Sequence, residues 1–383
     1  MACLKPYGLR RVYLSKEDVT AWKECRASAV EVPSVMAEHQ VVDENSGTRV
    51  NTATTRGNLN ELTGTITITL PSTASDFASR ADLELLFYAA GFVKSAGKYK
   101  PLNTGACGST IKMYCVDRTG LLGEYLTGII VTSIDVTCNN SDAPTISFAY
   151  QAADKVECWA TALTDDLASG AEYLESGTGI SLADGFGGAD WTNLPFVADI
   201  GGESISLVSS DADYVYFGSA TTQAHTTGDA VTIQPPALYT AITAAPLATS
   251  RDWRMDDNYG NGDFKFTGAT LNVETGMSYG DRIAGSRGLS EVLFGTINAT
   301  MTGTLYVEAT THPQISYAAA TNSDLGYIIT INSGADAYSM AFSRANISGI
   351  PDLSLAKDAP ATADITISMI AGSSGFDNCI VIG

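Results

Sequence analysis

Hydrophobic and polar residues alternate along much of this chain with a period of two. In residues 61–70, Thr63, Thr65, Thr67 and Thr69 alternate with apolar residues and glycine. This period is typical of a half-buried β-strand with one polar face. The same reasoning predicts further strands at 129–137, 145–149, 204–208, 214–217, 230–233, 264–274, 294–308, 327–331, 338–343 and 363–370.

One helix interrupts the strand pattern. Ser75 or Ser79 can cap its start, and Gly91 ends it. Its apolar face consists of residues at helical spacing, namely Leu83, Leu86, Phe87 and Ala90. A shorter counterpart is predicted near residues 313–320, so each half of the chain should be a small β-sandwich or barrel with a helix in at least the first.

Two segments of the chain resemble each other. Residues 55–70 (TRGNLNELTGTITITL) align without a gap on residues 286–301 (SRGLSEVLFGTINATM), about 231 positions apart. The alignment places Gly64 on Gly295 and Thr69 on Thr300. These matches indicate one supersecondary unit that occurs twice.

A second pair of segments occurs in the same order. Gly128 aligns with Gly349, and Thr145-Ile146-Ser147 aligns with Thr366-Ile367-Ser368, about 221 positions apart. Residues from about 155 to 245 match neither copy. We therefore expect a first domain at 1–153, an inserted β-domain or linker at 154–245, facing outward, and a second domain at 246–383.

Charge excludes several classes of function. The 383-residue chain has 45% hydrophobic residues and a formal charge of −20, and its 22 Lys and Arg residues form no cluster. A sequence-specific DNA-binding protein needs a basic stripe. No apolar run approaches the roughly 18 residues that span a bilayer, and the N-terminus lacks the apolar core of a signal peptide. The seven irregularly spaced cysteines indicate synthesis in a reducing compartment.

No catalytic or metal-binding motif emerges from the sequence. His39, His225 and His312 lack metal-ligand spacing, and no CxxC, GxSxG, P-loop or HExxH pattern occurs. The glycine-rich GFGG at 185–188 lacks a strand–helix frame. We therefore expect neither an enzyme nor a cofactor or metal ion.

Polar loops precede both copies of the Arg-Gly segment, at residues 43–55 and 276–286. Each contains an acid, an arginine and glycine. They are either solvated hairpin tips or arms that pack on a neighbouring subunit. In the second case the candidate assembly residues are Asp43, Glu44, Arg49, Arg56, Asp281, Arg282 and Arg287.

Several segments resemble the tail tube proteins of long-tailed, siphovirus-like bacteriophages. They are LTGTITITLPST, LELLFYAAGF, TGIIVTSIDVT followed by APTISFAYQ, and the C-terminal SGIPDLSLAKDAPATADITISMIA. The resemblance covers about 1–153 and 246–383. It implies a β-barrel that lines a channel, with loops and arms joining successive rings. Tandem members of this family form trimeric rings with pseudo-sixfold symmetry.

The resemblance leads to a specific expectation. The chain should be a mainly β structural virion protein with two tandem tail-tube domains, forming homotrimeric rings that stack into the phage tail tube. Its partners should be further copies of itself, the tail terminator, tape measure and distal tail proteins, and viral DNA passing without specific binding; no membrane is expected. An acidic wall would repel DNA within a Debye length of about 8 Å.

An alternative class remains open. A phage surface or fibre-like β-protein could bind host glycans, and exposed aromatic clusters would favour it. The sequence shows no such cluster. Saturable sugar binding without polymerisation would distinguish this class from a tube protein.

Overall fold

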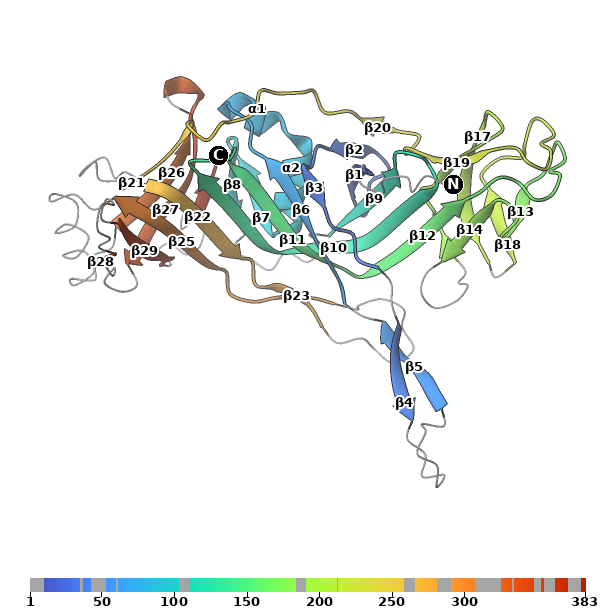
Figure 1. The fold of residues 1–383 in the computed structure, drawn as a ribbon, viewed down its shortest axis with the longest axis horizontal. Helices are drawn as coiled ribbons and strands as arrows, with labels where there is room; N and C mark the ends of the chain where they lie inside the picture. The colour runs from blue at the N-terminus through green and yellow to red at the C-terminus, as the bar shows by residue number, and fades with distance from the viewer. Residues whose placement is uncertain are drawn as a thin grey trace.

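The chain is mainly β, as the alternation predicts (Figure 1). A computed structural model describes residues 10–34, 37–42, 53–59, 61–102, 110–183, 191–211, 213–257, 266–280, 291–306, 325–332, 334–347, 353–354, 362–370 and 380–383. These residues contain two short α-helices among the strands.

The first half contains most of the long strands. Its elements are β1 (Arg10–Lys16), β2 (Trp22–Cys25), β3 (Ala29–Val30), β4 (Ala37–Val42), β5 (Ala53–Leu59), β6 (Leu62–Thr69), α1 (Ala74–Ser79), α2 (Ala81–Ala89), β7 (Phe92–Ser95), β8 (Lys98–Pro101), β9 (Ile111–Asp117), β10 (Leu122–Asn139) and β11 (Thr145–Ala152). The 18-residue strand β10 takes part in two sheets. Its first part pairs with β9, and its second part pairs with β11.

The middle segment has a sheet of its own. Its elements are β12 (Asp154–Ala160), β13 (Tyr173–Glu175), β14 (Ile180–Ala183), β15 (Trp191–Thr192), β16 (Val197–Ile200), β17 (Glu203–Ser210), β18 (Tyr214–Phe217), β19 (Val231–Gln234) and β20 (Tyr239–Thr240). Strands β13, β18, β17, β16 and β19 are neighbours in that order, and β15 also pairs with β17. Strand β12 instead pairs with β10 and extends the sheet of the first half.

The second half repeats much of this order. Its elements are β21 (Trp253–Asp257), β22 (Phe266–Glu274), β23 (Met277–Tyr279), β24 (Val292–Phe294), β25 (Asn298–Tyr306), β26 (Leu325–Ile331), the 3-10 helix η1 (Gly334–Asp336), β27 (Tyr338–Ile347), β28 (Leu353–Ser354), β29 (Thr362–Met369) and β30 (Ile380–Ile382). In both halves a long strand near the middle pairs with the last long strand: β6 with β11, and β25 with β29.

The helix forms where expected but starts at a different cap. Thr73 Oγ1 accepts a hydrogen bond from the Asp76 backbone N–H at 3.1 Å, so Thr73, rather than Ser75 or Ser79, is the N-cap. Arg80 then separates α1 from α2 and forms a buried ion pair with Asp82 at 2.5 Å. Gly91 adopts a φ of +76° and ends α2, as predicted. The helical counterpart expected at 313–320 lies outside the described residues.

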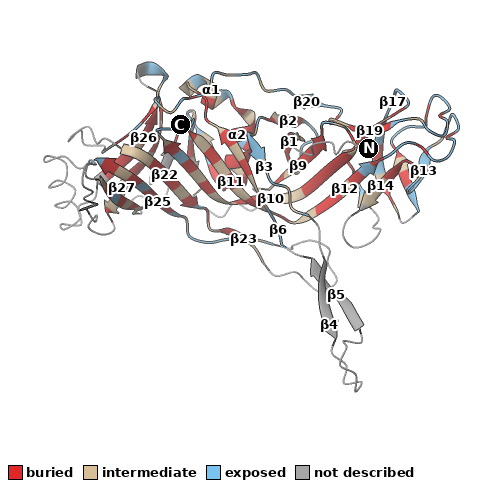
Figure 2. Cartoon of the chain, in the orientation of Figure 1, coloured by how far each residue is buried: buried red, intermediate tan, exposed pale blue. Residues whose placement is uncertain are grey.

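Two hydrophobic clusters hold the layers together (Figure 2). The larger cluster draws residues from both halves, including Ile68, Leu271 and Met340, each fully buried. The smaller cluster joins the first half to the middle sheet, where the Tyr114 and Phe196 ring centroids lie 5.4 Å apart. The two halves are therefore not separate globules, because they share a single core.

Backbone pairing also connects the halves. Strand β10 pairs antiparallel with β22 through seven partners, from Ser133 opposite Glu274 to Asn139 opposite Gly268. The C-terminal strand β30 crosses back and pairs with β8 of the first half. Among side chains, the buried Tyr338 stacks on Phe77, with centroids 4.6 Å apart.

Two expectations require correction. The strand predicted at 294–308 is interrupted at residues 295–297, where the Gly295 N–H donates to the Gly276 carbonyl at 2.6 Å. Gly276 and Gly295 lie where two backbones approach closely. Gly295 precedes β25, whereas Gly64 lies inside β6, so the two glycines are not structurally equivalent. Thr69 pairs with Thr145, whereas Thr366 pairs with Thr302, so the alignments of Thr69 on Thr300 and of Thr145 on Thr366 differ from each other by two residues in register.

A bulge at Gly128 allows β10 to change layers. The β9–β10 register shifts between Leu126 and Ile129, and Gly128 has a φ of +60°. Its N–H donates to the Glu17 carboxylate, and its carbonyl accepts from the Tyr279 hydroxyl of β23. The bulge therefore also anchors the second half to the first.

We expect Gly128→Ala to lower the free energy of unfolding by about 2–4 kcal/mol, because it combines a left-handed φ with overpacking. A Cβ at this position would lie 2.5 Å from the Ala153 Cβ. The matched control is Gly97→Ala, since Gly97 has a φ of +78° and nothing within 4 Å of an added Cβ. Urea denaturation measures both; equal losses would contradict a packing role for Gly128.

Tyr338→Phe should lower the free energy of unfolding by about 1–2 kcal/mol, because it leaves a buried acceptor without its donor. The Tyr338 hydroxyl donates to the Pro71 carbonyl at 2.6 Å, which connects the second half to the first. Tyr338→Ala, which also loses the Phe77 stack, should cost about 3–5 kcal/mol. Tyr306→Phe, at a ring that is 37% exposed, is the control, and an equal denaturation midpoint for Tyr338→Phe would refute the connection.

Candidate functional site

Six neighbouring strands from both halves form one continuous sheet with a polar face. Their order is β6, β11, β10, β22, β25 and β29, and every junction is antiparallel. One side of each strand is buried in the shared core. The other side, which we call the polar face, consists of exposed and half-buried residues that are mostly threonine, serine and asparagine. The polar alternation predicted for residues 61–70 is confirmed in β6.

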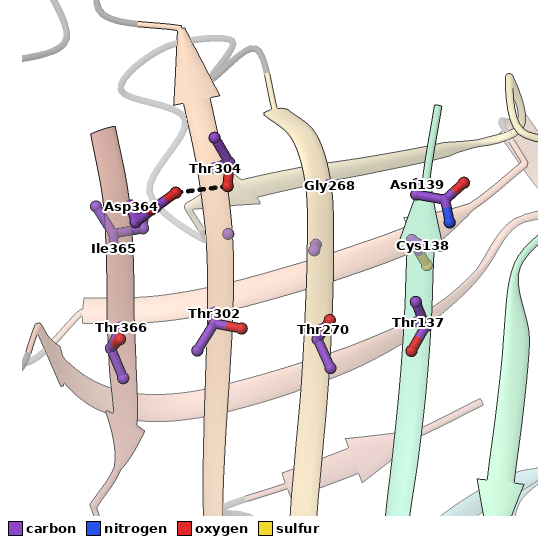
Figure 3. Close-up of a pocket in the computed structure, with 12 residues that line it drawn as sticks. Thr137, Cys138, Asn139, Gly268, Thr270, Thr302, Thr304, Asp364, Ile365 and Thr366 are labelled. Atoms are coloured by element: carbon purple, nitrogen blue, oxygen red, sulfur yellow. Dashed lines mark hydrogen bonds between the residues drawn. The ribbon is translucent and has the colours of Figure 1, made fainter. Parts of the chain in front are cut away.

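The strand registers align threonines into a row across the whole sheet. Each threonine is the direct cross-strand partner of the next, in the order Thr69, Thr145, Thr137, Thr270, Thr302 and Thr366. Figure 3 shows the last four of these in one line over four strands. Threonine suits this place because its β-branched side chain favours strands, while its hydroxyl remains available to water.

A second polar row runs beside the first, in the order Thr67, Ser147, Asp135, Asn272, Thr300 and Ser368. Its members bond to one another across strands. The Thr67 and Ser147 hydroxyls lie 2.7 Å apart, and Asn272 Nδ2 donates to Asp135 Oδ1 at 2.6 Å. These contacts fix side-chain positions and reduce the number of groups that can capture a ligand.

The polar face carries few charges. Its carboxylates on the six strands are Asp135, Glu274 and Asp364, and these strands contain no lysine or arginine. On the described strands the polar face is therefore mainly a hydroxyl surface.

A shallow depression of about 380 Å³ lies on this face between β10, β22, β25 and β29 (Figure 3). Thr304 Oγ1 donates to Asp364 Oδ1 at 2.5 Å beside it. Burial raises the pKa of Cys138 to about 12, so its thiol is protonated at neutral pH and is no nucleophile. The lining residues include no histidine, lysine or arginine to activate a hydroxyl, so the depression offers hydrogen bonds but no catalytic pair.

Metal and disulfide chemistry also lack a site in the described part of the chain. No group of three or more His, Cys, Asp or Glu residues is placed to hold a metal ion there. Cys25, Cys115, Cys138 and Cys158 are free and buried.

The predicted assembly residues fall mostly outside the described residues. Six of them do so: Asp43, Glu44, Arg49, Asp281, Arg282 and Arg287. Arg56 lies in β5, opposite His39 of β4. The β4–β5 hairpin projects from the body of the molecule (Figure 1). In the second half, the β23–β24 hairpin occupies the corresponding place between β22 and β25 in chain order.

The middle sheet carries an exposed aromatic cluster that sequence reasoning missed. Tyr173 of β13 contacts Tyr214 and Tyr216 of β18, with ring centroids 5.0 and 6.2 Å away. Their positions, about 40 residues apart in the sequence, converge only through strand pairing. Period-two spacing of Tyr214 and Tyr216 was the available signal, because it places both on one face of a strand.

None of the helices in the described residues is long and apolar enough to cross a membrane. A scan against protein-family models and a search of curated proteins each found no match to this chain.

Proposed function

We propose that this chain is a subunit of a bacteriophage tail tube, and that its polar face lines the channel through which DNA passes. The observation that carries the proposal is the β10–β22 pairing. Within one chain, this pairing joins the edge of the first-half sheet to the edge of the second-half sheet, and the strands of the two sheets follow the same order. The same kind of pairing could therefore form between the corresponding free edges of two chains.

The repeated strand order supports two tube domains, at 1–153 and 246–383. In the first half, β3, β6, β11 and β10 are neighbours in that order. In the second half, β22, β25 and β29 are neighbours, followed by β27 and β28. The outer layers match too, since β1, β9 and β10 correspond to β21, β26 and β27.

This correspondence identifies the two edges that would meet between chains. Strand β22 corresponds to β3, and the end of β27 with β28 corresponds to the end of β10. Among the described strands, β3 pairs with β6 alone and β28 pairs with β29 alone. The β27–β28 edge of one chain would therefore pair with β3 of the next, just as β10 pairs with β22. Exposed edges of this kind favour association with another chain.

Closure follows from the family resemblance. Six repeats make a ring in tail tube proteins, so three of these chains would close one. Closing the sheet into a barrel removes the remaining edges. The six positions are similar but not equivalent, because only the first repeat is followed by the inserted sheet.

The polar face suits a conduit that does not retain DNA. Lysine and arginine contacts to phosphate provide most of the affinity of non-specific DNA binding, and the six strands contain neither residue. Hydroxyl groups exchange a hydrogen bond to phosphate for one to water at little net gain. Asp135, Glu274 and Asp364 add weak repulsion. The β4–β5 and β23–β24 hairpins would join successive rings, and the tail terminator, tape measure and distal tail proteins would contact the ends and lumen.

Purified protein at high concentration should polymerise into long hollow tubes with threefold rings. Negative-stain electron microscopy with image averaging measures this, and a phage lysate provides the same observation on native particles. A protein that stays monomeric at high concentration, together with lysates that lack tubes, would refute the proposal. Saturable sugar binding without polymerisation would support the glycan-binding alternative instead.

Val30→Pro should block polymerisation while the monomer stays folded. Val30 lies in β3, which pairs with β6 alone among the described strands. Proline removes the Val30 N–H donor and is tolerated on an edge strand. Val30→Ile keeps the donor and is the matched control.

Sedimentation velocity would report assembly for both Val30 variants, and circular dichroism would report folding. We expect Val30→Ile to form tubes and Val30→Pro to remain a folded monomer. Normal tubes from a folded Val30→Pro protein would show that β3 is not the interchain edge.

A further inference from the structure

The inserted middle sheet carries an exposed tyrosine patch, formed by Tyr173, Tyr214 and Tyr216. Tyr173 is directly opposite Tyr216 across the β13–β18 pair. Tyr173 is 52% exposed and Tyr214 is 38% exposed, although the opposite face of the same strands is buried. Figure 1 places β13 and β18 at the end of the molecule opposite β25 and β29.

The patch is held in place before any ligand arrives. Asp211 Oδ1 accepts hydrogen bonds from the backbone N–H groups of Asp213 and Tyr214, at 2.9 and 2.7 Å. Its other oxygen accepts from the Tyr216 hydroxyl at 2.6 Å. That hydrogen bond raises the pKa of Tyr216 to about 12 and lowers the pKa of Asp211. The β17–β18 turn and one ring are thus fixed together, which reduces the entropy lost on binding.

The stretch of sequence that contains the patch has acidic residues but no lysine or arginine. The 95 residues from 156 to 250 contain 12 Asp and Glu residues and no lysine or arginine, so all 22 basic residues of the chain lie elsewhere. Exposed carboxylates flank the tyrosines directly in sequence, at Glu172, Glu175 and Asp213. A field of this kind attracts cations and repels phosphate-bearing molecules.

We propose that the tyrosine patch docks a basic segment of a partner protein, with arginine or lysine side chains seated against the tyrosine rings. Cations are attracted to the faces of aromatic rings, and arginine also stacks on them. The flanking carboxylates supply the long-range attraction and pair with neighbouring basic groups. Tyrosine anchors are common at protein interfaces because they bury a large area at a small entropy cost.

Other occupants fit the patch less well. Nucleic acids and phosphorylated glycans would meet repulsion from the exposed carboxylates of Glu172, Glu175 and Asp213. A neutral glycan could stack on the rings, but it carries no charge and is therefore not attracted by the acidic residues of this 95-residue stretch. The proposal is independent of the tube function, since it concerns a different sheet and a different face of the chain.

Fluorescence anisotropy with a labelled oligo-arginine peptide at physiological ionic strength tests the proposal on the full chain. The Tyr173→Leu/Tyr214→Leu double variant should bind about tenfold more weakly, since each exposed cation–π contact accounts for a few-fold in affinity. Tyr173→Phe/Tyr214→Phe keeps both rings and should bind within about twofold of the parent. Tyr306→Leu, at an exposed tyrosine outside this sheet, should leave binding unchanged.

Circular dichroism of each variant would establish that the sheet remains folded, and the phenylalanine variant covers the case in which the leucine variant does not fold. A folded leucine variant that binds oligo-arginine as tightly as the parent would overturn the proposal, because attraction would then come from net charge alone. A phenylalanine variant that loses binding would also overturn it. Neutral oligosaccharides that bind the parent but not the leucine variant, with oligo-arginine binding unaffected, would replace the basic partner with a glycan.

Discussion

The antiparallel pairing of β10 with β22 is the interaction on which the rest of the structure depends. Its seven register partners convert two separate sheets into one, and it fixes which side of β22 enters the shared core. A slip of one residue would exchange the polar and apolar faces of every strand beyond the junction. The pairing therefore determines both the core and the polar face. Among the described strands it leaves β3 paired with β6 alone and β28 paired with β29 alone, and these are the two edges that we propose to meet between chains.

Sequence periodicity predicted the strands but not their register. The alternation of Thr63 to Thr69 correctly identified the polar side of β6, because burial on one side is a local property of a strand. The threonine row is not local, since it requires five pairings to be in phase. The duplicated segments indicate Thr69 on Thr300 and Thr145 on Thr366, but Thr69 pairs with Thr145 whereas Thr366 pairs with Thr302, so the two alignments differ by two residues in register. The second copy is also interrupted where the Gly276 and Gly295 backbones approach too closely for side chains.

Other features depended on contacts between distant segments. Gly128 was recognised as a repeated glycine, but its bulge and its bond with Tyr279 require the second half to be in place. The tyrosine patch was missed for the same reason: Tyr173 meets Tyr216 through a sheet whose strand order, β13 next to β18, cannot be read from spacing. The net charge helps to exclude classes of function such as sequence-specific DNA binding. It does not predict where in the fold the acidic residues lie, because net charge does not reveal which face bears them.

The location of charge gives the two surfaces different physical roles. The polar face has hydroxyls, three carboxylates and no basic residue on its six strands, so its interactions with a polyanion are weak at every point. Residues 156–250, which lie in the chain between the two repeats, contain 12 acids and no lysine or arginine. Screening limits the reach of these charges to about 8 Å in physiological salt. Acids around β13 and β18 therefore contribute little to the field at β25 and β29, which lie at the opposite end of the molecule. The two proposals, passage of DNA along the polar face and docking of a basic partner on the inserted sheet, are thus electrostatically compatible.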